Sequence, residues 1–113
     1  MTARPKSAPV RSTEYRRAVA SLPCKRCGIH GYSQAAHPNT GKGAGIKTSD
    51  TDCFALCCDR PGVQGCHVLF DQHAIYTRAV RRVLEEAWAA DTRRQIGAMG
   101  LWPKNLQQPE DAT

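Results

Sequence analysis

Six cysteines in a chain of 113 residues constrain this sequence more than any other feature. A disulfide framework would account for them in an exported protein. Residues 1–10, however, contain no apolar segment of the kind that directs export. Thiols in a reducing compartment bind metal more often than they form disulfides, and a domain this small needs a cross-link or a bound metal for stability. We therefore expect a metal site in a cytoplasmic protein.

Four of the cysteines are spaced as zinc ligands. Cys24 and Cys27 form a Cys-x2-Cys turn, Cys57 ends a short apolar run, and Cys66 opens the segment that follows. Four thiolates from two chain segments can close a tetrahedral site with each sulfur about 2.3 Å from zinc. The sequence therefore predicts a structural zinc ion bound by these four residues.

Three alternatives to this ligand set stay open. The cysteines could be buried or incidental thiols that bind no metal. Cys58 is adjacent to Cys57 and could replace it, because the eight-residue spacer before the last cysteine is longer than a zinc knuckle needs. His30 or His73 could also replace one of the cysteines. We expect Cys53 to be a core thiol.

The apolar pattern predicts a compact α+β domain. Ser12 or Thr13 can cap a short helix over residues 14–20, which ends before Pro23 because a residue that precedes proline leaves the helical region. Residues 54–56 form an apolar run typical of a strand that leads into the third zinc ligand. We expect two short strands joined by a long glycine-rich loop.

The last third of the chain has helical periodicity. Its apolar positions are Tyr76, Ala79, Val80, Val83, Leu84, Ala87 and Trp88, and Arg78, Arg81, Arg82, Glu85 and Glu86 lie mostly on the other side. The pattern predicts an amphipathic helix over about residues 72–98, with its arginines on a solvated face. The expected organisation is a disordered basic tail over 1–10, one domain over 11–102 and a flexible tail over 103–113.

The charge balance indicates the class of partner. Sixteen Lys and Arg against ten Asp and Glu give a net charge of +6 and a pI near 9.2, which favours polyanions. No run of about 18 apolar residues occurs, so we expect no membrane span. The candidate phosphate contacts are Lys42 and Lys47 in the glycine-rich loop, with Arg16, Arg17, Lys25 and Arg26. Ordinary solvated surface charge is an equally good explanation for any one of them.

A second group of residues carries chemistry. His67 and Asp71 are four residues apart, so on a helix they share one face and can bind one divalent ion. In isolation, such a pair is more often a surface hydrogen bond. His37 follows the Cys-x2-Cys turn on the expected first strand, and a neutral imidazole beside a metal-bound phosphate can act as a general base. The alternative is a structural histidine.

The order of these motifs resembles the HNH endonucleases of the His-Me (ββα-metal) finger superfamily, and within it small phage and prophage nucleases of the YbcO-like group. The motifs are Cys24-x2-Cys27, Ala36-His37, Gly45-Ile46-Lys47-x2-Asp50, Ala55-Leu56-Cys57 and Cys66-His67-x3-Asp71. Over residues 21–75, the resemblance implies a β-hairpin followed by a helix, with a metal ion held between them. We expect flanking N- and C-terminal helices around this ββα-metal core.

The resemblance also implies roles. His37 would be the general base, His67 and Asp71 would hold a catalytic Mg²⁺, Mn²⁺ or Zn²⁺ ion, and the four cysteines would hold structural zinc. Many members carry a metal ligand where Ala36 stands. The family uses an asparagine to orient the base, and Asp50 and Asp52 are the nearest candidates for that role in this sequence.

The expected function is metal-dependent hydrolysis of phosphodiester bonds in DNA, in the cytoplasm of the bacterial host of a phage or prophage. The alternative is a non-catalytic zinc module that binds nucleic acid or a phage or host protein. A homodimer through Trp88 or Trp102 also stays open.

Overall fold

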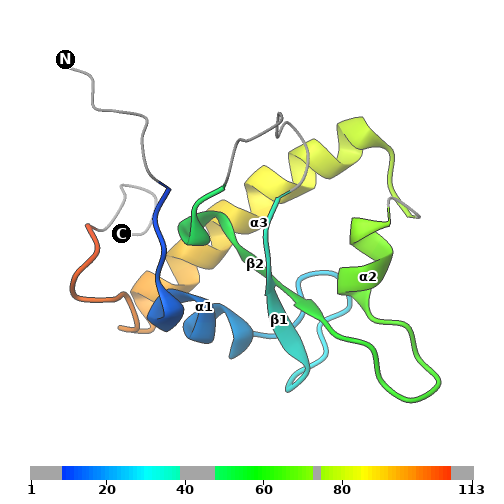
Figure 1. The fold of residues 1–113 in the computed structure, drawn as a ribbon, viewed down its shortest axis with the longest axis horizontal. Coiled ribbons are helices and arrows are strands. Elements are labelled where there is room, and N and C mark those ends of the chain that lie inside the picture. The colour runs from blue at the N-terminus through cyan, green and yellow to red at the C-terminus, as the bar shows by residue number, and fades with distance from the viewer. Residues whose placement is uncertain (1–8, 39–47, 73–74, 108–113) are drawn as a thin grey trace.

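The computed structural model describes residues 9–38, 48–72 and 75–107. In chain order its elements are helix α1 (Thr13–Ala20), strand β1 (Ser33–Ala36), a 3₁₀ turn η1 (Asp50–Asp52), strand β2 (Phe54–Cys57), helix α2 (Cys66–Asp71) and helix α3 (Arg78–Ala98) (Figure 1). The described chain is therefore a small α+β fold, as the apolar pattern predicts. Of the described helices, none is long and apolar enough to cross a membrane.

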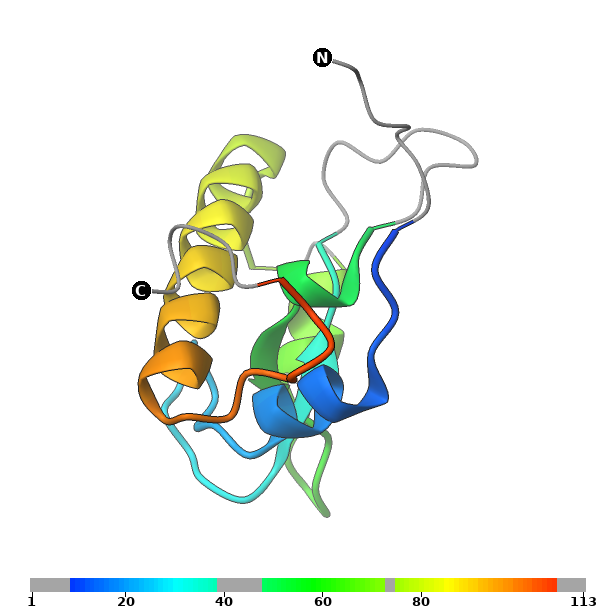
Figure 2. The ribbon, with the colours of Figure 1, turned by 90° about the vertical axis from the view of Figure 1, so that its left-hand side faces the viewer.

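The two strands form an antiparallel pair in which Ala36 lies opposite Phe54 and Ser33 lies opposite Cys57. Because side chains alternate along a strand, the sheet has two apolar faces. Ala36, Phe54 and Leu56 pack with Phe70 of α2, whereas Ala35 and Ala55 pack with the apolar residues of α1. The longest helix, α3, lies beside the sheet and contributes to both clusters (Figure 2).

Helix α1 begins and ends close to its predicted bounds. The Ser12 side chain is the N-cap and accepts a hydrogen bond from the Tyr15 N–H at 3.0 Å. This bond satisfies one of the donors that the first turn leaves unpaired. Tyr15 and Val19 are fully buried against the sheet, so α1 is held by its apolar face as well as by its cap.

Helix α3 begins later than predicted. The helical periodicity suggests a start near residue 72, but α2 ends at Asp71 and α3 begins at Arg78, where the Thr77 side chain accepts from the Val80 N–H at 3.2 Å. A separate short helix thus precedes the long one, because a second N-cap interrupts the periodic segment.

The buried face of α3 also differs from the prediction. Arg81 is 0% and Glu85 3% exposed, whereas Val80 is 44% and Val83 65% exposed. The Arg81 guanidinium lies 4.8 Å from the centre of the Phe70 ring, and its Nη2 lies 3.6 Å from Glu85 Oε2. A cation–π contact and an ion pair offset the desolvation of this arginine, so the expectation that it belongs to a solvated face is wrong.

The described ends of both predicted tails pack against the domain. The Val10 N–H donates to Ser49 Oγ at 2.9 Å, and its carbonyl accepts from the Asp50 N–H. At the other end Pro103 is buried, and the Trp102 indole donates to the Leu106 carbonyl at 3.1 Å. Residues 103–106 therefore pack against the domain. Residues 1–8 and 108–113 lie outside the described chain.

Candidate functional site

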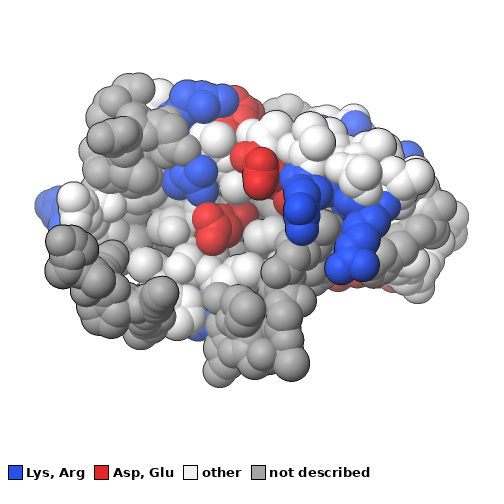
Figure 3. Space-filling view, turned by 90° about the horizontal axis from the view of Figure 1, so that it is seen from above, with Lys and Arg blue, Asp and Glu red and all other residues white. Residues whose placement is uncertain are grey.

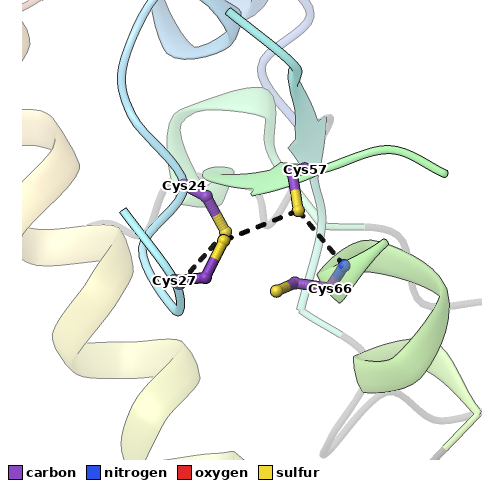
Figure 4. Close-up of side chains that lie close together, drawn as sticks. All are labelled: Cys24, Cys27, Cys57 and Cys66. Atoms are coloured by element: carbon purple, nitrogen blue, oxygen red, sulfur yellow. Dashed lines mark hydrogen bonds between the residues drawn. The ribbon is translucent and has the colours of Figure 1, made fainter. Parts of the chain in front are cut away.

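The sulfur atoms of Cys24, Cys27, Cys57 and Cys66 all lie within 4.8 Å of one another (Figure 4). The Cys27 and Cys57 sulfurs are 3.8 Å apart. A tetrahedron with bonds of about 2.3 Å has edges of about 3.8 Å, so this spacing fits a zinc ion. All six cysteines are free thiols rather than disulfides. The four residues predicted as ligands thus form a cluster that can hold a structural metal such as zinc.

The first two ligands come from a closed turn before β1. The Cys24 N–H donates to the Ile29 carbonyl at 3.0 Å, and the Gly28 N–H donates to the Cys24 carbonyl at 2.9 Å. Gly28 has φ +82°, a conformation that glycine adopts without a steric cost. This turn places the Cys27 N–H 3.5 Å from the Cys24 sulfur, so both thiols point to the same side.

The other two ligands come from the end of β2 and the start of α2. The Cys66 N–H donates to the Cys57 sulfur at 3.3 Å. The spacer between them folds back through a turn in which Arg60 and Val63 exchange backbone hydrogen bonds. Glycine is needed at position 65 for this close approach of the chain to Cys58. A side chain there would clash, because its Cβ would lie 2.4 Å from the Cys58 carbonyl carbon. The long spacer is therefore compatible with the cluster.

The geometry also decides among the alternative ligands. Cys58 is adjacent to Cys57 in sequence, but the cluster of four sulfurs does not include it. Among the described residues, the cluster holds no histidine, which leaves His30 outside it. His73 lies outside the described residues.

Two arginines lie against the sulfurs. The Arg26 Nη1 donates to Cys66 Sγ at 3.5 Å, and its guanidinium stacks over the Tyr76 ring at 6.0 Å. Burial opposes ionisation of Cys57, but the Cys66 N–H and the Arg60 guanidinium outweigh it and lower the pKa of this thiol to about 7. Burial raises the pKa of Cys66 to about 12. Four thiolates therefore need a cation to coexist, and metal binding would release protons.

His37 lies just after β1 and is paired with a buried carboxylate. Its Nε2 is 3.0 Å from Oδ1 of Asp50, the first residue of η1. The other carboxylate oxygen accepts from the Ser12 N–H at 2.7 Å and from the Arg16 guanidinium. Burial alone would raise the pKa of Asp50, but the Ser12 N–H, His37 and Arg16 together hold that pKa below its usual value. Asp50 is thus an ionised acceptor, and the proton of His37 belongs on Nε2.

His37, Asp50 and Cys53 also have donor atoms within 4.8 Å of one another. Burial raises the pKa of the Cys53 thiol to about 12, and both Asp50 oxygens already accept hydrogen bonds. The Arg16 guanidinium beside this carboxylate repels a second cation. The group therefore fits a hydrogen-bonded pair beside a core thiol, as Cys53 was predicted to be, better than a metal site.

The helix pair predicted to bind a divalent ion is present on α2. His67 Nε2 lies 3.4 Å from Asp71 Oδ2, and His67 Nδ1 lies 2.9 Å from Gln34 Oε1 of β1. Within the described chain, His37 does not share a cluster of donor atoms with this pair. Ala36 faces α2, and the next residue, His37, turns towards Asp50 and α1. The three side chains are therefore not direct ligands of one ion.

Of the four predicted phosphate contacts that the structure describes, three have partners inside the chain. Arg16 pairs with Asp50, Arg26 contacts Cys66 of the cysteine cluster, and Lys25 pairs with Asp91 and with Gln95 Oε1. Arg17 is exposed on α1, and Lys42 and Lys47 lie outside the described residues. On the face seen in Figure 3, cations and carboxylates interleave.

The second orienting candidate, Asp52, has a different partner. Asp52 pairs with Arg93 of α3 at 3.2 Å, whereas Asp50 accepts the hydrogen bond from the His37 imidazole. Sequence reasoning missed Gln34, because a lone glutamine in a strand carries no motif. Its contact with His67 follows from the packing of α2 on β1.

The comparisons with known proteins do not assign a family. No family model and no solved structure matches the chain. A stretch of 72 residues, 61% of this chain, is 33% identical to peptidyl-prolyl cis-trans isomerase D of Eremothecium gossypii. The chain spans one fifth of the length of that protein.

Proposed function

We propose that this chain is a metal-dependent HNH-type endonuclease that hydrolyses phosphodiester bonds in DNA, with a ββα-metal finger formed by β1, β2 and α2. The observation that carries the proposal is the His37–Asp50 pair at the end of β1. An imidazole held by a buried carboxylate is the arrangement that general-base chemistry needs. The chain order of two antiparallel strands followed by a helix, braced by the cysteine cluster, supports the same family.

Asp50 sets which nitrogen of His37 is the base. Because the carboxylate accepts from Nε2–H, Nδ1 keeps its lone pair and can take a proton from water. The side chain of His37 is 35% exposed, so water and a phosphate can reach it. The Ser12 N–H and the Arg16 guanidinium hold Asp50 ionised and in place, which keeps the imidazole in one orientation.

His67 and Asp71 offer one nitrogen and one oxygen ligand on the face of α2 that meets β1. Such a pair leaves coordination positions open to phosphate and water. A divalent ion bound there would stabilise the charge on the scissile phosphate and on the leaving 3′-oxygen. The general base need not touch this ion, because it acts on the water.

Plasmid nicking tests the proposal. Purified zinc-loaded protein should nick supercoiled DNA with Mg²⁺, Mn²⁺ or Zn²⁺ added. His37→Ala should lose at least about 10²-fold in rate. His30→Ala replaces an exposed histidine and should cleave like wild type. Zinc content and circular dichroism of both variants should match wild type.

Two outcomes would reject the nuclease. Folded wild-type protein that cuts no DNA with any of these ions would favour the non-catalytic zinc module. Equal cleavage by His37→Ala and wild type would remove His37 from the mechanism.

A further inference from the structure

Gln34 joins the hairpin to the helix that carries the proposed metal ligands. It lies on β1 opposite Leu56, and its side chain is exposed at the surface that meets α2. Its Oε1 is 2.9 Å from His67 Nδ1. This amide therefore ties the imidazole of α2 to the sheet.

The contact determines where the proton of His67 resides. An amide oxygen is only an acceptor, so Nδ1 must carry the proton. In the neutral ring Nε2 then keeps its lone pair, and that lone pair lies 3.4 Å from an oxygen of Asp71. Two acceptors at this separation repel one another unless a cation lies between them.

The opposite orientation of the Gln34 amide would give a different site. Its NH₂ group would donate to Nδ1, and Nε2–H would then donate to Asp71 in an ordinary hydrogen bond. No lone pair would remain for a metal. The tautomer of His67 therefore separates a metal site from a surface hydrogen bond.

We propose that Gln34 is a positioning residue of a divalent-cation site, which it forms by holding His67 as the Nδ1–H tautomer so that Nε2 and Asp71 Oδ2 are presented to one ion. The inference rests on the proposed function, because it concerns the ligands of the same ion. Partners of this kind orient metal-binding histidines, and their loss costs about 10- to 100-fold in metal affinity.

Long-range ¹H–¹⁵N correlation spectra of the full zinc-loaded chain read the tautomer directly, with His67→Ala used to assign the signal. Wild-type His67 should be the Nδ1–H tautomer at neutral pH. In Gln34→Leu this preference should disappear, and Mn²⁺ affinity measured by paramagnetic broadening should fall about 10-fold. Gln34→Glu keeps an acceptor and should keep the tautomer. Gln107→Leu changes an exposed glutamine elsewhere and should leave both readouts unchanged.

The results separate this inference from the nuclease itself. A Nε2–H or doubly protonated ring in wild type, or unchanged Mn²⁺ affinity in Gln34→Leu, would overturn the role of Gln34 even if the protein cleaves DNA. The expected tautomer and Mn²⁺ binding in a protein that cleaves no DNA would support the cation site and reject only the endonuclease.

Discussion

His37 Nε2 and Asp50 Oδ1 are 3.0 Å apart, and this contact joins the end of β1 to η1. Asp50 is 1% exposed, and its carboxylate is also held by Ser12 and Arg16, at the start of α1. Three segments that are distant in sequence therefore meet at one ionised group. The orientation of the imidazole depends on all of them.

Replacing Asp50 with Asn should lower the rate of DNA nicking about 10²-fold or more, provided that His37 is the base. The amide can donate to the imidazole instead of accepting from it, which moves the proton to Nδ1 and removes the lone pair that takes the proton from water. Single-turnover nicking at saturating protein measures the effect. Asp52→Asn is the matched control, because Asp52 pairs with Arg93 and not with His37. Equal rates in both variants would contradict the orienting role.

The pKa of Asp50 should be visible in its own titration. Burial would raise that pKa, but the Ser12 N–H, His37 and Arg16 lower it below the ordinary value of about 3.9. The lowered pKa contributes stability that is complete above about pH 4 to 5 and is lost as pH falls through the folded-state pKa. Carbon-detected NMR of the carboxyl group should show no protonation step at or above pH 3.9 while the chain is folded. A step above that value would be inconsistent with the hydrogen bonds described.

The sequence predicted best those parts of the fold that local chemistry determines. A Cys-x2-Cys turn brings two sulfurs together by its length alone, and the Ser12 cap acts within one helical turn. Spacing alone does not distinguish Cys57 from Cys58 as the third ligand, because the fold determines which of the two thiols faces the cluster. The turn in the spacer resolves it by bringing Cys66 back to Cys57.

The face of α3 could not be predicted from hydrophobicity. The periodicity predicts that Arg81 faces solvent, yet its guanidinium contacts an aromatic ring of another helix and a carboxylate of its own helix. The ring is that of Phe70 in α2, and the carboxylate is that of Glu85, one turn along α3. Only the tertiary packing of α2 on α3 brings the ring into place. The role of Gln34 could not be predicted for the same reason, because tertiary packing brings it to His67 of another element.

Removing the buried arginine should be costly. Arg81→Ala removes the buried ion pair with Glu85 and the contact with Phe70, so we expect a loss of about 3 kcal/mol in the free energy of unfolding. Arg78→Ala, on the exposed first turn of α3, should change it by less than about 0.5 kcal/mol. Urea unfolding of zinc-loaded protein measures both. Similar values for the two variants would mean that Arg81 is not stabilising in solution.

Zinc removal should unfold the domain. The cysteine cluster joins the turn before β1, the end of β2 and the start of α2, so these segments lose their common anchor when the metal leaves. Elemental analysis should find one zinc ion per chain, and a chelator should abolish the cooperative thermal transition. Cys57→Ser should bind zinc more weakly and lower the melting temperature, whereas Cys58→Ser, which changes the neighbouring thiol outside the cluster, should do neither. Native protein without zinc, or equal losses in the two serine variants, would contradict the four-cysteine site.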